Sequence, residues 1–213
     1  MDKQGALYFC GEGLCLKNDK DASLAIKHSK KESTEKDAAR EFGIGSNYTN
    51  ACLASWITSE SNQNITKNWV ATPKDFLVYV GVPGSGKTYF SAALCNYIFA
   101  KNKQPRYIHI RDFLGNCKKT FDTPGENPLD YVKKVAAADF LVIDDLGSTM
   151  NTEWQQELIL ALIDIRYSNN AATCITTNLS PEQMTSMLGE RVSRRLFDKQ
   201  NKMILASRPY AKI

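Results

Sequence analysis

Residues 81–88 have the sequence GVPGSGKT, a complete G-x-x-x-x-G-K-T phosphate-binding loop. The apolar run at 76–80 predicts a buried strand that enters the loop, and the segment at 89–98 predicts a helix that leaves it. Glycines let backbone N–H groups turn toward a phosphate without a Cβ in the way, and the helix N-terminus adds partial positive charge. A strand, this loop and a helix in register predict a nucleoside triphosphate site.

Two side chains of the loop have expected roles of their own. Lys87 can reach the β- and γ-phosphates, and the Thr88 hydroxyl can ligate Mg²⁺. The residues that we assign to nucleotide binding are Gly81, Pro83, Gly84, Ser85, Gly86, Lys87, Thr88 and Tyr89.

A second motif, DFLVIDDLG at 139–147, supplies carboxylates for the metal and the water. Its apolar residues predict a central parallel strand, which delivers the side chains that follow it to the C-terminal edge of the sheet. We expect Asp144 to hold Mg²⁺ and Asp145 to lie nearer the attacking water. The alternative is a strand followed by a solvated acidic turn.

A third segment, AATCITTN at 171–178, predicts another short buried strand with a polar end. Asn178 could orient the water between Asp145 and the γ-phosphate. Ser180 and Pro181 directly afterwards predict the N-cap and the first residue of a helix. These two interpretations use different residues, so both can hold.

A fourth segment, GERVSRRLF at 189–197, places three arginines on one short helix. One interpretation is an exposed basic helix. The other is an arginine finger that one subunit offers to the nucleotide of another.

Together the motifs resemble those of the AAA+ ATPases of the DnaC/DnaI helicase-loader and IstB transposition-helper group. Residues 81–88 are similar to that family's Walker A, and LVIDDLG to its Walker B, with Asp-Asp where most AAA+ proteins have Asp-Glu. TTNLS is similar to its sensor-1 segment, and LGERVSRRL to its arginine-finger box. The resemblance spans about residues 44–206. It implies that Arg195 is the finger and that Arg191 is the earlier arginine of the box.

The resemblance also implies a fold and an activity. The expected fold is α/β, a P-loop NTPase with an AAA+ core: a parallel sheet flanked by helices on both faces, without a C-terminal lid domain. The expected cofactors are ATP and Mg²⁺, and ATP hydrolysis should be slow and stimulated by DNA or a partner. The expected partners are single-stranded DNA, a replicative helicase or a transposase, and further copies of the chain in an ATP-dependent homo-oligomer. The loop at 121–128, with Lys118 and Lys119 at its edge, falls where relatives contact single-stranded DNA.

Several functions therefore compete. The leading hypothesis is a DNA replication protein similar to a DnaC-type helicase loader, and an IstB-like transposase helper shares every motif and differs only in its partner. A small-molecule P-loop kinase is a different class, but few basic anchors lie between the loop and the second carboxylate strand. The last alternative is an ATP-gated, non-hydrolysing scaffold, because Asp145 is one methylene shorter than Glu.

Composition limits the organisation and the setting. A chain of 213 residues suits one ATPase core, 44–213, and a short N-terminal appendage, 1–43, which is a candidate for partner binding. No apolar run approaches the roughly 18 residues of a membrane span, and no signal peptide is visible. Cysteines within predicted core elements indicate reduced thiols and a cytoplasmic location. Cys10 and Cys15 form a close pair, but two histidines leave too few ligands for a convincing zinc site.

The net charge of +4 is concentrated near the C-terminus, where the last 34 residues hold seven bases and three acids. Such a surface suits either a neighbour's triphosphate or a nucleic-acid backbone.

The elements that we expect follow from the hydrophobic pattern. Residues 6–10 predict a small hairpin or a partner-binding segment, 22–42 a weakly amphipathic helix, 50–56 a helix, and 59–67 a polar loop. The core is expected to alternate strand and helix over 76–80, 87–101, 106–110, 111–121, 128–138, 139–144, 151–168, 173–177, 181–188, 190–197 and 201–206.

Overall fold

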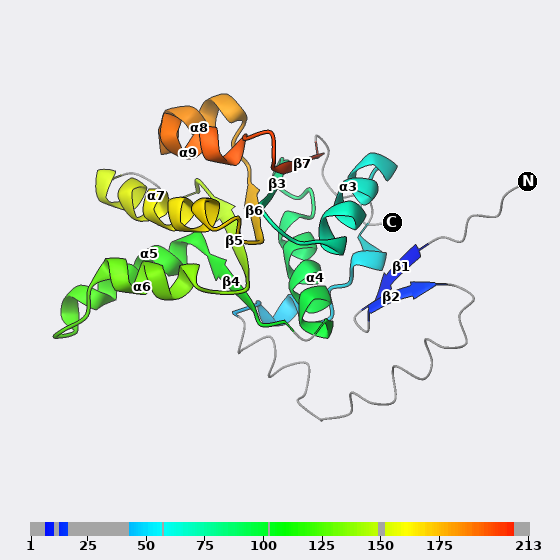
Figure 1. Ribbon diagram of the computed structural model, residues 1–213, viewed down its shortest axis with the longest axis horizontal. Coiled ribbons are helices and arrows are strands. Elements are labelled where there is room, and N and C mark those ends of the chain that lie inside the picture. The colour runs from blue at the N-terminus through cyan, green and yellow to red at the C-terminus, as the bar shows by residue number, and fades with distance from the viewer. Residues whose placement is uncertain are drawn as a thin grey trace, which may run out of the picture.

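A five-stranded sheet forms the centre of the computed structural model, which describes residues 7–10, 13–16, 43–56, 58–101, 103–148 and 152–206. All neighbouring strands of this sheet run parallel (Figure 1). Across the sheet the order is β4 (Pro105–His109), β5 (Phe140–Leu146), β6 (Thr173–Thr177), β3 (Phe76–Gly81) and β7 (Lys202–Ala206). Strand β6 therefore lies between the strand that enters the phosphate-binding loop and the strand that ends in paired acids.

Alternate residues of each central strand enter two separate hydrophobic clusters. In β3, Leu77 and Tyr79 belong to one cluster, and Phe76 and Val78 belong to the other. All four side chains are almost fully buried. A strand that is buried on both sides reads as a continuous apolar run, and for this reason the hydrophobic pattern predicted it well.

Helices cover both faces of the sheet (Figure 1). The first cluster holds side chains of α3 (Glu60–Ala71) and α4 (Lys87–Ala100). The second cluster holds side chains of α5 (Ile110–Lys119), α6 (Pro128–Ala136), α7 (Glu153–Ser168), α8 (Pro181–Leu188) and α9 (Glu190–Leu196). This arrangement confirms the predicted parallel sheet with helices on both faces.

The prediction of a polar loop at 59–67 is wrong, because helix α3 begins at Glu60. The Ser59 side chain caps the helix by accepting a hydrogen bond from the Asn62 N–H. The Asn62 amide is itself buried, and it donates to the Leu205 carbonyl across the sheet edge. The polar composition hid the helix because the polar side chains on its inner face form hydrogen bonds there.

The helix expected at 50–56 is present only as a short 3₁₀ turn, η3 (Leu53–Ser55). Side chains of α4 bind the backbone of this segment instead. The Tyr89 hydroxyl contacts both the N–H and the carbonyl of Cys52, and the Asn96 amide donates to the carbonyls of Thr49 and Ala51. These contacts satisfy backbone groups that a helix would have paired internally.

Near the N-terminus, β1 (Leu7–Cys10) pairs antiparallel with β2 (Gly13–Leu16), which is the hairpin, one of the two interpretations of residues 6–10. The helix expected at 22–42 lies outside the described residues. Further short turns are η2 (Ser46–Tyr48) and η4 (Thr120–Asp122). Over the described ranges, no helix is both long and apolar enough to cross a bilayer.

Candidate nucleotide-binding site

The phosphate-binding loop joins the end of β3 to the start of α4, and its glycines are required by the backbone. Gly84 and Gly86 have φ angles of 77° and 85°, in the left-handed region that side chains with a Cβ rarely adopt. At Gly81 the constraint is space, because a Cβ would lie 2.5 Å from the Ser85 hydroxyl oxygen. The backbone angles or the available space thus explain each of the three glycines in the sequence motif.

Lys87 lies at the first position of α4 with its side chain largely buried. Its ammonium donates hydrogen bonds to the carbonyls of Gly81 and Val82, at 2.8 and 2.9 Å. Burial lowers the pKa of Lys87, and the negative charges of Asp145 and Asp144 oppose this shift. The nearby carboxylates thus help to keep the ammonium charged at the loop.

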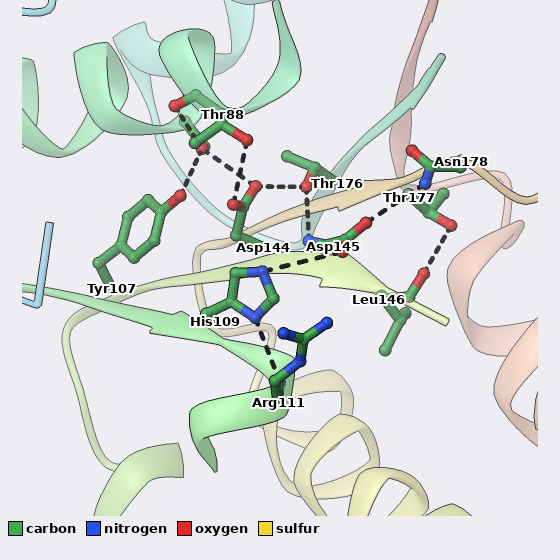
Figure 2. Close-up of polar contacts among 11 residues, drawn as sticks. Thr88, Tyr107, His109, Arg111, Asp144, Asp145, Leu146, Thr176, Thr177 and Asn178 are labelled. Atoms are coloured by element: carbon green, nitrogen blue, oxygen red, sulfur yellow. Dashed lines mark hydrogen bonds and ion pairs between the residues drawn. The ribbon is translucent and has the colours of Figure 1, made fainter. Parts of the chain in front are cut away.

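Asp144 is held at the end of β5 by three hydroxyl groups (Figure 2). Thr176 donates to Oδ1 at 2.6 Å and Ser91 donates to the same oxygen at 3.5 Å, while Thr88 donates to Oδ2 at 3.2 Å. The carboxylate is 2% exposed. The two predicted Mg²⁺ ligands, Thr88 and Asp144, are therefore in direct contact.

This donor set fits the expected metal. Mg²⁺ prefers oxygen ligands, and it is commonly held by one or two carboxylates together with substrate phosphates. Thr88 and Asp144 offer a hydroxyl and a carboxylate next to the loop that would carry those phosphates. The loop also holds the buried Ser85 hydroxyl, which has no hydrogen-bond partner among the described residues.

Asp145 follows directly but points elsewhere because the backbone turns at this residue. Its φ of 61° lies in the left-handed region, and the pairing of β5 with β6 shifts register between Ile143 and Leu146. The Asp145 N–H donates to the Thr176 hydroxyl at 2.9 Å. Consequently Asp144 is buried while Asp145 keeps 29% of its side chain exposed.

Two side chains from neighbouring strands flank the Asp145 carboxylate (Figure 2). The Asn178 amide donates to Oδ1 at 3.4 Å, and His109 Nε2 lies 3.8 Å from Oδ2. His109 Nδ1 accepts the Arg111 N–H at 3.3 Å, which places the proton of a neutral ring on Nε2, toward Asp145. The structure thus brings Asn178 and Asp145 together as the sequence predicted.

The position of His109 at this site was not predicted from the sequence, where the two histidines were candidates for zinc ligands only. A signal did exist. His109 ends the strand next to β5, in register with Asp144, and it is the N-cap of α5. A polar residue at the end of a neighbouring parallel strand reaches the same edge of the sheet.

Tyr89 and Tyr107 extend the site into the core. The Tyr89 hydroxyl binds the backbone of Cys52 and so ties α4 to the segment before α3. The Tyr107 hydroxyl oxygen lies 3.4 Å from the Ser91 hydroxyl oxygen. Burial and the charge of Asp144 raise the pKa of Tyr107 well above its ordinary value, so this phenol stays neutral beside the carboxylate.

The predicted arginines lie apart from this cluster, on α9. Arg195 Nε lies 2.5 Å from Asp164 Oδ1 on α7, and the Arg195 side chain is 24% exposed. Arg191 and Arg194 are mostly exposed, with Arg194 paired to Glu190. Within the described ranges, the side-chain contacts of Arg191 and Arg195 are with Asp164, with Tyr167 and with each other, and not with the phosphate-binding loop. Helices α4 and α9 belong to the clusters on opposite faces of the sheet.

The fold and the arrangement of these residues define a P-loop NTPase of the AAA+ class. A sequence model described as "IstB-like ATP binding protein" matches residues 60–199, and the chain belongs to this family. The replicative helicase loader DnaC of Escherichia coli K12 is 32% identical over 119 residues, which cover 56% of this chain and 49% of DnaC. DnaC of Buchnera aphidicola subsp. Acyrthosiphon pisum is 28% identical over 138 residues, 64% of this chain and 52% of that protein. The chain thus spans about half the length of the curated relatives it matches.

Solved structures agree with the family. A crystal structure of the DnaC helicase loader superposes with a TM-score of 0.65 and 29% identity, covering 76% of this chain and 99% of that one. The replication initiator DnaA bound to AMPPCP and single-stranded DNA has the same TM-score at 16% identity, covering 79% of this chain and 51% of that one. At that identity the likeness to DnaA shows the fold alone.

Proposed function

We propose that this protein is an ATP-dependent DNA replication protein of the helicase-loader type, which hydrolyses ATP with Mg²⁺ and assembles on single-stranded DNA. The observation that carries the proposal is the meeting of Thr88, Asp144, Asp145 and Asn178 at one end of the sheet, beside the phosphate-binding loop. The similarity to DnaC supports the choice of partner, a replicative helicase.

For hydrolysis, Thr88 and Asp144 would hold Mg²⁺, and Lys87 would bind the β- and γ-phosphates. When bound, Mg²⁺ would supply positive charge against the phosphate oxygens. The Asp145 carboxylate, flanked by Asn178, would orient the attacking water and accept its proton. The hydroxyl contacts of Asp144 support this division of labour, because they keep it buried while Asp145 faces outward.

For assembly, we propose that Arg195 contacts the nucleotide of a neighbouring copy, with Arg191 beside it. The placement of α4 and α9 on opposite faces of the sheet supports an action between chains. In the same proposal, residues 44–213 form the ATPase core and residues 1–43 are an appendage that binds a partner.

For DNA, we propose the tip between α5 and α6 as a contact. Phe121 is 65% exposed there, and its ring centroid lies 5.8 Å from that of Trp154 at the start of α7. Exposed Lys118 and Lys119 precede it. Aromatic rings beside positive charge are the features on which successive bases of a single strand stack.

The experiment is a pull-down of the tagged full-length chain from its native host with ATP and Mg²⁺ present, and Lys87→Ala is the matched control. A replicative helicase captured only by the ATP-binding chain would support the loader function. Capture of a transposase would favour the helper function, which the family match also suggests. If the wild type shows no ATPase activity with single-stranded DNA and the captured partner, the non-hydrolysing scaffold replaces the proposal.

A further inference from the structure

The side chain of Arg195 is fixed by contacts within its own chain. Its Nε lies 2.5 Å from Asp164 Oδ1, and its Nη1 donates to the Arg191 carbonyl at 2.8 Å. The guanidinium carbon lies 5.9 Å from the centroid of the Tyr167 ring. Arg195 is thus held within its own chain by an ion pair at Nε and a hydrogen bond at Nη1.

The neighbouring groups are arranged to keep this contact in place. The Tyr167 hydroxyl donates to Asp198 Oδ2 at 2.7 Å, and this hydrogen bond raises the pKa of Tyr167. Arg191 Nη2 lies 3.9 Å from Asp164 Oδ2, so both oxygens of Asp164 face arginines of α9. Asp164 therefore connects the rigid helix α7 to the charged side of α9.

The ion pair with Asp164 can order the Arg195 side chain before it binds another molecule. Helix α9 spans only seven residues, and arginine is a long side chain that must be ordered before it can bind a phosphate at a fixed place. Arg194 of the same helix lacks such an anchor: it is 76% exposed, and within the described ranges its ion pair is with Glu190, on its own helix. Ordering Arg195 in advance lowers the entropy cost of assembly.

We propose that Asp164 is a positioning residue for Arg195, which sets the direction in which the guanidinium faces a neighbouring copy. The inference rests on the proposed action of Arg195 between chains. Asp164 should therefore affect ATP turnover only in the chain that supplies the arginine, and not in the chain that binds the nucleotide.

Mixed preparations separate these two chains. A donor chain carries Lys87→Ala and supplies Arg195, while an acceptor chain carries Arg195→Ala and keeps its phosphate-binding loop. Their mixture, assayed for ATP turnover with Mg²⁺ and single-stranded DNA, is the reference. Asp164→Asn in the donor should lower turnover by about 10²-fold, because a misplacement of about 1 Å has effects of that size. In the acceptor it should change turnover less than about two-fold, since that chain lacks Arg195.

Two controls address folding and charge. Asp130→Asn in the donor breaks an exposed ion pair with Lys133, at 3.0 Å, and should leave the reference turnover unchanged. Asp164→Glu in the donor keeps the charge and should recover part of the turnover that Asp164→Asn loses. Thermal unfolding of each chain should show that the variants are folded.

Equal losses with Asp164→Asn in the donor and in the acceptor would assign a merely structural role and overturn the proposal. Unchanged or increased turnover with the substituted donor would also overturn it. An inactive reference mixture would contradict the action of Arg195 between chains, and this proposal with it. That last outcome can be distinguished from the others, because the reference mixture carries no substitution at Asp164 and tests only the action of Arg195 between chains.

Discussion

At the scale of single residues, the Thr176 hydroxyl explains how two adjacent acids take different positions. It donates to Asp144 Oδ1 and accepts the N–H of Asp145, whose backbone is left-handed. One hydroxyl therefore fixes the buried carboxylate and also stabilises the turn that exposes the next one. A left-handed conformation costs a residue with a Cβ roughly 1–2 kcal/mol, and the hydrogen bond to Thr176 offsets part of this cost.

Nucleotide binding is tested at Lys87. We expect Lys87→Ala to abolish ATP binding or weaken it severely, because Lys87 carries the ammonium of the loop. Titration calorimetry with ATP and Mg²⁺ measures this. Lys101→Ala, at the exposed C-terminal end of α4, is the control and should bind as the wild type does. Equal affinities of Lys87→Ala and the wild type would contradict the assignment of the loop.

Water activation is tested at Asp145 and Asn178. Asp145→Asn and Asn178→Ala should each lower turnover while ATP affinity stays within a few-fold, since both residues act on the attacking water. Asp144→Asn should differ, with some binding retained and Mg²⁺-dependent turnover lost. Steady-state kinetics and equilibrium binding on the same preparations separate these cases. A large loss of ATP affinity in Asp145→Asn would assign this residue to binding instead.

At the scale of elements, the sequence predicted the core closely. All the predicted strands and helices from 76 to 206 are present, with bounds within two residues of those expected. Continuous apolar runs and clear caps, such as Ser180 and Pro181 before α8, explain this success. Helix α3 was missed because its buried face carries polar side chains: Thr66 donates to the Asn62 carbonyl one turn earlier, and Asn62 donates to Leu205, which is distant in the sequence.

Contacts between elements that are far apart in the sequence could not be predicted either. Asn178 was found because it ends its own strand. His109 and Asp164 contact their partners only through the packing of a neighbouring strand or helix. Arg166 is another such residue, since a basic side chain in an apolar helix gave no sign of burial.

Arg166 connects three elements and provides a test of stability. Its side chain is 1% exposed, and it donates to the carbonyls of Ala136, Ala138 and Ala172 and to the Thr173 hydroxyl. Burial lowers its pKa to about 10, so the guanidinium stays charged at neutral pH.

We expect Arg166→Met to lower the free energy of unfolding by at least about 3 kcal/mol, because several buried carbonyls lose their donor at roughly 1–3 kcal/mol each. Urea unfolding measures the loss. Arg106→Met is the control: Arg106 donates to one exposed carbonyl, so its loss should be below about 1 kcal/mol. Similar losses in the two variants would mean that the buried network contributes little.

At the scale of the whole molecule, the proposed DNA contact and the nucleotide site lie at the two ends of α5. His109 caps the start of this helix beside Asp145, and Phe121 follows its end. Ten residues of helix span about 15 Å, so a rigid element separates the two sites. A change at the tip can therefore be tested without disturbing the phosphate-binding loop.

Phe121→Ala should weaken the binding of single-stranded DNA by about 1–3 kcal/mol, the range for losing one stacked base. Fluorescence anisotropy with a labelled oligonucleotide at fixed salt measures the affinity. ATP affinity should be unchanged, because the ring lies beyond the end of α5. Leu129→Ala is the matched control, since Leu129 is 49% exposed at the start of α6 but offers no ring for stacking. If Leu129→Ala weakened DNA binding as much as Phe121→Ala, the contact would be a general apolar one and the stacking role of Phe121 would be wrong.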